Sequence, residues 1–429
     1  MAATPSRFSS ALLEKIKHYA TFQQTPVSLR QMVEFGHRPS QLTLLRATQF
    51  VHHELPIRLA HRVVELDALP HALSEMPSVQ RVKHMYTQSF KDLIDFPEAA
   101  TFGVPDAVLR DKPHLTGRPG WAGIRYFNPP KDPHAAGVPP PPIAPEIHAY
   151  NDAFVNALAT IKTRHDPVVT AIAQGIIELK EHWARTNSPM LRGANPSKAL
   201  LPTAIQAFLD RFFMSRIGIR ILIGQQIALN KAATDGESNR DYVGIICTKT
   251  NLGAITQDAI DNARFICQEY YGLFDGPQVR MIGQTDIHFM YVPSHLHHML
   301  FELLKNSLRA VVERHGIDAD SYPEIRVVVA AGKEDLTIKI SDEGGGIPRS
   351  GMPLIWTYMY TTAEHPSYEE GYNKSDFRAP LAGFGYGLPL SRLYARYFGG
   401  DLRLISMEGY GTDAYLHLNR LSDTEEPLM

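Results

Sequence analysis

The stretch His298-Met299-Leu300-Phe301-Glu302-Leu303-Leu304-Lys305-Asn306 lies inside a segment, residues 294–314, whose apolar spacing predicts a helix. Three polar residues of the stretch recur every four positions and so share one helical face: His298, Glu302 and Asn306. Two cations lie beside that face: Lys305 and Arg309. An Asn oxygen suits Mg²⁺, and a Glu is able to take a proton from an attacking hydroxyl. A solvated charged face would give the same pattern, so this stretch alone leaves both interpretations open.

A glycine-rich turn, Ser341-Asp342-Glu343-Gly344-Gly345-Gly346-Ile347-Pro348, follows a predicted strand over residues 336–340. Its three glycines permit a tight turn that brings the backbone close to a flat ligand. Asp342 would then accept a hydrogen bond from the amino group of an adenine. An ordinary turn at the end of a strand is the alternative.

A second glycine-rich motif, Gly383-Phe384-Gly385-Tyr386-Gly387-Leu388-Pro389, opens a predicted helix over residues 389–398. Backbone N–H groups at a helix N-terminus bind phosphate, and Pro389 suits the first turn because its missing N–H has no partner there. The motif is neither the Walker pattern nor the dinucleotide fingerprint. Between the two motifs, residues 361–381 predict a lid over a nucleotide, and the hydroxyl of Thr412 predicts a phosphate contact. A plain surface loop is the alternative for both.

Strands and helices alternate beyond residue 241, which predicts an α/β sandwich. The expected strands are 243–247, 327–329, 336–340, 402–405 and 414–418, and a further expected helix is 254–271.

The first half of the chain is expected to be helical. Its long amphipathic segments would pack as a four-helix bundle: 42–69, 78–96, 149–186 and 202–230. Pro56 is expected to interrupt the first of them. A Pro- and Gly-rich stretch at about residues 97–147 is expected to be an insertion, either a spacer or a polyproline site for a partner. These features predict a helical domain (1–235), an α/β-sandwich domain (236–422) and a short tail (423–429).

Composition excludes several classes of protein. The chain has 429 residues, 44% hydrophobic and 21% charged, as is typical of a globular protein. Its net charge of −2 argues against holding nucleic acid by bulk charge. The sequence contains no apolar run of about 18 residues, so no membrane span is expected. Cys247 and Cys267 are too few and too far apart for a disulfide scaffold or a thiolate zinc site. Residues 1–20 fit either a transit peptide or a first amphipathic helix.

The order and spacing of the motifs resemble the ATP-binding superfamily that includes sensor histidine kinases, Hsp90 chaperones, type II topoisomerases and MutL. Within it, the chain resembles the mitochondrial pyruvate dehydrogenase kinases. Besides residues 298–306 and 383–389, the stretches that carry this resemblance are Ser406-Met407-Glu408-Gly409-Tyr410-Gly411-Thr412-Asp413, Glu54-Leu55-Pro56-Ile57-Arg58-Leu59-Ala60, Phe208-Leu209-Asp210-Arg211 and Met214-Ser215-Arg216-Ile217-Gly218-Ile219-Arg220.

The resemblance implies a multidomain fold, with a regulatory four-helix bundle followed by an α/β-sandwich kinase domain. It implies a protein serine kinase of the mitochondrial matrix that uses ATP and Mg²⁺, with K⁺ as an optional further ion, to phosphorylate and inactivate the E1α subunit of the pyruvate dehydrogenase complex. The implied partners are E1α, the lipoyl domain of the E2 core and a second copy of the chain. No nucleic acid and no membrane span are expected.

The resemblance also implies roles for single residues. Glu302 matches the general base and His298 the residue that tunes it, while Lys305 would offset charge on the transferring phosphoryl group. Asn306 matches the Mg²⁺ ligand and Asp342 the adenine contact. Glu302 is also expected beside the nucleotide, whose other implied contacts are Arg309, Gly344, Gly346, Thr361, Thr362, Gly383, Phe384, Gly385, Tyr386, Gly387, Leu388 and Thr412.

An inhibitory pocket for pyruvate-like carboxylates is implied in the helical half. Its matching residues are Tyr86, Ser89, His165, Ser215, Arg216 and Arg220. Two arginines one helical turn apart make physical sense as a carboxylate clamp. A pair of buried structural ion pairs is the alternative.

Some features depart from the pattern of the pyruvate dehydrogenase kinases, and others fit a different function. The family's longer C-terminal tail, with an Asp-Trp pair used in dimer contacts and lipoyl docking, has no match before Met429. Residues 242–248 look more like the branched-chain 2-oxoacid dehydrogenase kinase, whereas residues 379–382 and 407–408 look more like the pyruvate enzyme, which we favour. His53-Glu54-Leu55 resembles the start of a histidine kinase phosphoacceptor box, although Pro56 comes too early. Besides the two kinds of kinase, a scaffold that binds ATP without transferring phosphate is a further alternative.

Overall fold

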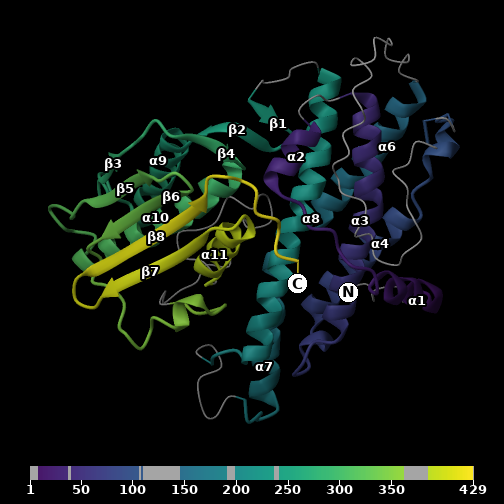
Figure 1. The fold of residues 1–429 in the computed structure, drawn as a ribbon. Coiled ribbons are helices and arrows are strands. Elements are labelled where there is room, and N and C mark those ends of the chain that lie inside the picture. Colours follow the sequence, from purple (N-terminus) through teal and green to yellow (C-terminus); the bar gives the residue numbers. More distant parts are fainter. Residues whose placement is uncertain are drawn as a thin grey trace. The chain divides into compact units, whose positions relative to one another are not determined.

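The computed structural model describes residues 8–36, 40–105, 108–109, 145–190, 199–235, 241–361 and 385–428 (Figure 1). The chain divides into two compact units. One, the helical unit, contains Met1–Arg192, Ser215–Ile245 and Leu428–Met429. The other, the α/β unit, contains Gly193–Met214 and Ile246–Pro427. One long helix, α8 (Thr203–Asp235), belongs to both units: its residues up to Met214 are in the α/β unit, and those from Ser215 are in the helical unit.

The described part of the helical unit contains helices and one short strand. In chain order its elements are α1 (Ser10–Tyr19), α2 (Leu29–Gly36), α3 (Gln41–Asp67), η1 (Leu73–Glu75), α4 (Pro77–Ile94), η2 (Ala99–Phe102), α6 (Pro145–Arg164), α7 (Val168–Arg185), the part of α8 (Thr203–Asp235) after Met214, and β1 (Tyr242–Val243). Helix α3 contacts α4 and α6, and α4 contacts α7. The prediction of a helical first half is confirmed.

Two prolines affect the helices differently from the sequence-based expectation. Pro56 lies inside α3, which continues through it, so the predicted interruption is wrong. Both neighbours, Leu55 and Ile57, are fully buried, and this packing offsets the loss of one backbone hydrogen bond. Conversely, the single segment expected over 149–186 is two helices, α6 and α7, because Pro167 disfavours helical backbone at the residue before it.

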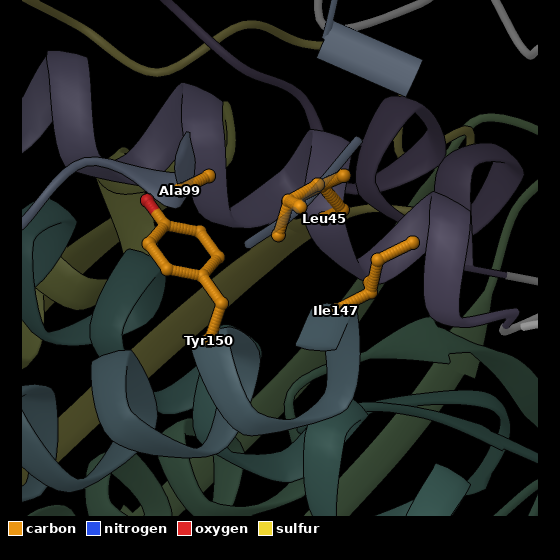
Figure 2. Close-up of a cluster of buried hydrophobic side chains, with 5 residues drawn as sticks. Leu45, Ala99, Ile147 and Tyr150 are labelled. Atoms are coloured by element: carbon orange, nitrogen blue, oxygen red, sulfur yellow. The ribbon is translucent and has the colours of Figure 1, made fainter. Parts of the chain in front are cut away.

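A small apolar cluster anchors the ends of the predicted insertion to the helical unit. Figure 2 shows Leu45 of α3, Ala99 of η2, and Ile147 and Tyr150 of α6 gathered together, and Val104 completes the cluster. Ala99 and Val104, near the start of the stretch expected as an insertion, and Ile147, at its end, are thus part of a packed core. Residues 110–144, which include its four consecutive prolines, lie outside the described residues.

The α/β unit has a five-stranded sheet with the strand order β3-β5-β6-β8-β7. Its strands are β3 (Val279–Gly283), β5 (Ile325–Ala331), β6 (Asp335–Asp342), β8 (Gly411–Asn419) and β7 (Asp401–Met407). Strand β3 is parallel to β5, and the remaining neighbours are antiparallel. In addition, β2 (Ile246–Asn251) pairs with β4 (His288–Tyr291). The predicted hairpins of 327–340 and 402–418 are confirmed, whereas β3 and β4 were not predicted.

Three helices accompany the sheet: α9 (Leu252–Tyr271), α10 (Pro293–His315) and α11 (Gly387–Tyr397). Helix α10 contacts α9, α11 and strand β6, which makes it the central helix of this unit. The helices expected at 254–271, 294–314 and 389–398 are confirmed. The strand expected over 243–247 is wrong in extent, because Gly244, with φ of 63°, turns the chain between β1 and β2.

Helix α8 is the one helix of the described residues that is long and apolar enough to cross a membrane. Its window Thr203–Ala233 has a mean hydropathy of 1.2, and 72% of it is buried inside the structure. A buried core helix passes the same test of length and composition, so the feature is weak evidence for a span.

Candidate functional site

The centre of the site is a buried ion pair on α10. Lys305 Nζ lies 2.9 Å from Glu302 Oε1, and the side chains are only 2% and 7% exposed. The two residues are three apart, so one turn of the helix brings them together. Lys305 Nζ also lies 5.4 Å from the centre of the Phe301 ring. The sequence predicted Lys305 beside a phosphoryl group, whereas here its charge is directed at the Glu302 carboxylate.

Electrostatics keeps Glu302 ionised. Burial by itself raises the pKa of this carboxyl group, but the charge of Lys305, the His298 side chain and the Lys305 hydrogen bond outweigh it and hold the pKa below its usual value. His298 lies one turn earlier on α10, and its ring packs edge-on against Tyr394 of α11 at 5.2 Å. Glu302 is therefore present as a carboxylate at neutral pH, as a proton acceptor must be.

Gly387 places the N-terminus of α11 directly against Glu302. A Cβ at this position would overlap Glu302 Oε2, so any larger residue would require the carboxylate to move. Gly387 is the first residue of α11, where backbone N–H groups have no partner within the helix. Pro389 falls in the first turn, as predicted, although the helix begins two residues earlier. The second glycine motif and the Glu302 face are thus brought together.

An aromatic cluster holds the residues just before α11. Tyr386 is 3% exposed, and its ring lies 5.7 Å from that of Phe213 and 5.2 Å from that of Tyr358. Gly385 has φ of 76°, and a Cβ there would overlap the carbonyl of Tyr360. Of the other predicted nucleotide contacts in this region, Thr361 and Leu388 are half-buried, and Thr362, Gly383 and Phe384 lie outside the described residues.

Asp342, at the end of β6, is the second centre of the site. Its Oδ1 accepts hydrogen bonds from the backbone N–H groups of Gly344 (3.0 Å) and Thr412 (3.3 Å). Its Oδ2 accepts one from the hydroxyl of Ser307 on α10 at 2.9 Å. Burial raises the pKa of Asp342, and these three donors oppose the rise. Sequence reasoning missed Ser307, whose only signal was its position one residue after Asn306.

The glycines after Asp342 are required by protein contacts. A Cβ at Gly344 would lie 2.5 Å from Ala310 Cβ, and one at Gly346 would overlap the carbonyl of Met407. Gly345, with φ of 86°, donates its N–H to the carbonyl of Tyr410 at 2.9 Å. The turn is therefore packed between α10 and the hairpin of β7 and β8. Close packing against the protein is thus one reason for these glycines, and their predicted approach to a ligand stays a prediction.

The remaining predicted residues of α10 and β8 surround these two centres. Asn306 is half-buried and follows Lys305 directly. Arg309 pairs with Glu313 at 2.8 Å. The Thr412 hydroxyl hydrogen bonds with Ser406 Oγ at 2.8 Å, and the Thr412 backbone N–H donates to Asp342 Oδ1. The structure therefore places Thr412 next to Asp342. Among the described residues, no group of three His, Cys, Asp or Glu side chains is arranged to hold a metal ion.

The helical unit contains the second predicted site, around His165. Its ring stacks on that of Tyr86 with centroids 4.4 Å apart, and its Nε2 hydrogen bonds with Ser89 Oγ at 3.0 Å. All three residues are buried. The Oγ of Ser215 is buried as well and has no hydrogen-bond partner within the described part of the chain.

Arginines surround this cluster. Arg216 Nη2 donates to the carbonyl of His165 at 3.5 Å, and Arg220 pairs with Asp166 at 3.0 Å. Burial, with the charges of Arg216, Arg164 and Arg220, lowers the pKa of His165 to about 3. Burial raises the pKa of Tyr86 to about 12 against the opposing charges of Arg216, Arg62 and Arg220. Sequence reasoning missed Arg62, Arg164 and Asp166, since nothing in their spacing marks them.

Comparisons with known proteins define the class of both halves. Residues 291–422 match the model of the histidine kinase-, DNA gyrase B- and HSP90-like ATPases. Residues 26–247 match the model of the mitochondrial branched-chain alpha-ketoacid dehydrogenase kinase. The second half therefore has the ATPase domain that the order of its motifs predicted.

Full-length relatives narrow the class to one family. A mitochondrial pyruvate dehydrogenase (acetyl-transferring) kinase of Schizosaccharomyces pombe is 43% identical, over 99% of this chain and 100% of the relative. The corresponding kinase of Arabidopsis thaliana is 42% identical over 98% of this chain and 97% of its own, and human isozyme 4 is 38% identical over 95% and 84%. The chain belongs to the family of mitochondrial pyruvate dehydrogenase and branched-chain 2-oxoacid dehydrogenase kinases.

Proposed function

We propose that this chain is a mitochondrial protein serine kinase of the matrix that phosphorylates and inactivates the E1α subunit of the pyruvate dehydrogenase complex with ATP. The observation that carries the proposal is its near full-length similarity to proteins named mitochondrial pyruvate dehydrogenase kinases. The ATPase domain at residues 291–422 supports the use of ATP.

Glu302 is the proposed general base. Its Oε1 is engaged by Lys305, so Oε2, against Gly387, is the oxygen that accepts the proton of the serine hydroxyl. Lys305 keeps the base ionised and oriented, and His298 adds to that effect. When bound, Mg·ATP supplies the phosphoryl group and the metal charge that stabilises its transfer.

The proposed nucleotide site extends along α10. Asn306 offers a half-buried amide oxygen for Mg²⁺, next to the buried base. The N–H groups at the start of α11, around Gly385, Gly387 and Leu388, provide donors for phosphate. Asp342 provides an acceptor for adenine. The other predicted contacts, Arg309, Gly344, Gly346, Thr361, Thr362, Gly383, Phe384, Tyr386 and Thr412, and an optional K⁺, remain part of this proposal.

The cluster around His165 is proposed as a site for inhibitory pyruvate-like carboxylates. The arginines Arg216 and Arg220 supply positive charge, and the Ser215 hydroxyl has hydrogen-bonding capacity that no described residue uses. His165 stacks on Tyr86 and is neutral, so the positive charge at this cluster comes from the arginines.

The proposal includes a regulatory domain over residues 1–235 built on a four-helix bundle, a kinase domain over 236–422 and a short tail. We also propose that the chain forms a homodimer and binds the lipoyl domain of the E2 core. Exposed apolar side chains on the edge strand β7, Ile405 and Met407 at 62% and 67% exposure, support a protein contact there.

Transfer of labelled phosphate from ATP to purified pyruvate and branched-chain E1 components, with mapping of the modified residue, tests this function. We expect rapid serine labelling of pyruvate E1α, suppressed by pyruvate or dichloroacetate. Failure to label either E1 while ATP still binds would contradict the proposal. Labelling that pyruvate and dichloroacetate leave unchanged would contradict only the inhibitory pocket.

The branched-chain kinase is the second candidate, because residues 26–247 match its family model. Preferential labelling of the branched-chain E1 would support it. A histidine kinase is more remote. His53 is half-buried in α3, and burial lowers its pKa to about 4. Acid-labile phosphohistidine, in place of acid-stable phosphoserine, would favour that alternative.

A further inference from the structure

We propose that Ser307 is a positioning residue that makes the site selective for the 6-amino group of adenine, by fixing the one oxygen of Asp342 that is still able to accept a hydrogen bond. The inference rests on the proposed function in so far as Asp342 contacts the base of ATP. It adds a residue of α10 that no sequence motif marks, and it assigns this residue a role in choosing the nucleotide.

The contact is buried on both sides. Ser307 is 5% exposed and Asp342 is 7% exposed, and their side chains meet at 2.9 Å. Ser307 belongs to α10 and Asp342 to the last position of β6, so the hydrogen bond joins the central helix to the sheet. A buried hydrogen bond to a carboxylate is stronger and more directional than one at the surface. Asp342 is therefore fixed from the helix side by a single hydroxyl.

Counting acceptors identifies the free one. A carboxylate offers about four lone-pair sites, two on each oxygen. Both sites of Asp342 Oδ1 are used by the N–H groups of Gly344 and Thr412. Ser307 uses one site of Oδ2, and no donor within the described part of the chain uses the second. A ligand donor that reaches Asp342 must therefore bind the oxygen that Ser307 orients.

The chemistry of this arrangement favours an amino group over a carbonyl. Three donors directed at Asp342 stabilise the ionised carboxylate, which accepts hydrogen bonds and donates none. A 6-amino group satisfies such an acceptor, whereas a 6-oxo group presents a second acceptor and repels it. Without the Ser307 donor, Oδ2 has freer orientation and protonates more readily, and a protonated carboxyl group donates its O–H to a 6-oxo oxygen.

The test compares ATP with inosine triphosphate, which carries an oxo group in place of the 6-amino group. For the full-length chain, KM and kcat with each nucleotide are measured on E1, and Kd is measured by calorimetry. Ser307→Ala is expected to raise KM and Kd for ATP by about tenfold, the usual effect of losing one hydrogen bond to a charged group. The values for inosine triphosphate should change much less, and the effect should fall on KM more than on kcat.

Two further variants separate this role from packing. Ser307→Cys keeps a side chain of the same shape with a slightly larger atom that donates weakly, so it should resemble Ser307→Ala in its preference for ATP over inosine triphosphate. Ser391→Ala is the matched control, because Ser391 is fully buried on α11 and its Oγ has no partner within the described part of the chain. It should leave the preference unchanged.

The outcomes distinguish this inference from the proposed function. An unchanged ratio of the two affinities in Ser307→Ala, or full recovery in Ser307→Cys, would overturn the role of Ser307 while leaving the kinase assignment intact. A wild-type chain that binds ATP but labels no E1 would overturn the kinase assignment, and the affinity ratio would still test Ser307. Tighter ATP binding by Ser307→Ala would show that the hydroxyl competes with adenine, which contradicts the inference.

Discussion

The Glu302 pair and the His165 cluster both place ionisable groups in a buried environment, but they balance charge differently. Glu302 is neutralised by a lysine on the next turn of its own helix, and its pKa stays low. Burial, together with the charges of Arg216, Arg164 and Arg220, lowers the pKa of His165 to about 3, so its ring remains neutral. The first arrangement keeps a buried carboxylate ionised, and the second keeps a buried imidazole neutral beside arginine charges.

The largest expected effect comes from removing the carboxylate of Glu302, the proposed base. Glu302→Gln keeps an oxygen for Lys305 but cannot take up the serine proton. Because general-base catalysis contributes about 10²- to 10⁴-fold, we expect kcat to fall by about that factor while ATP binding persists. Single-turnover phosphorylation of E1 and calorimetry with ATP measure the two effects. Glu269→Gln, an exposed acid on α9, is the control, and full activity in Glu302→Gln would refute the assignment.

A smaller disturbance tests whether the position of that base matters. Gly387→Ala places a methyl group where Glu302 Oε2 now lies, so the carboxylate must move. A displacement of about 1 Å costs about a hundredfold in rate, and we expect a fall in kcat of that order. The control is Gly224→Ala, where the nearest atom, Ile245 Cγ2, is an ordinary 3.6 Å away. Equal activity of the two variants would show that Gly387 does not set the geometry of the base.

The smallest expected effect concerns His165 and the stability of the fold. Its pKa is about 3 in the folded chain and about 6.5 when unfolded, so below pH 6.5 the unfolded state binds the extra proton. Stability is therefore complete above pH 6.5 and is lost as the pH falls toward 3, by about 1.4 kcal/mol for each unit. Urea unfolding between pH 7.5 and 5.5 should show a steeper loss in the wild type than in His165→Gln. Parallel curves would contradict the neutral, buried state of His165.

Much of the fold was predictable from the sequence where the spacing of apolar residues fitted only one type of secondary structure. Alternation of Leu336, Ile338 and Ile340 predicted β6, and all three are buried. The pattern failed where tertiary packing overrides local preference, as at Pro56 inside α3. It also failed for β4, whose four residues are too few to show a period.

The candidate site was predictable in its chemistry and less so in its contacts. The spacing of His298, Glu302 and Asn306 indicated a functional face, and Glu302 is indeed buried beside the glycine motif. The roles of Ser307 and Arg164 depend on partners far away in the sequence, and single-sequence spacing carries no information on them. The glycines after Asp342 show a further gap, since their close packing against Ala310 and Met407 could not be read from the sequence.

Helix α10 also fixes the spacing and the relative orientation of Glu302 and Ser307. Glu302 and Ser307 are separated by five peptide units, which in a helix is about 7.5 Å of rise and about 140° of rotation. Inserting or deleting one residue between them would turn one centre by about 100° relative to the other, so that both could not remain aligned. We therefore expect this part of the chain to tolerate substitutions but not insertions or deletions between Glu302 and Ser307.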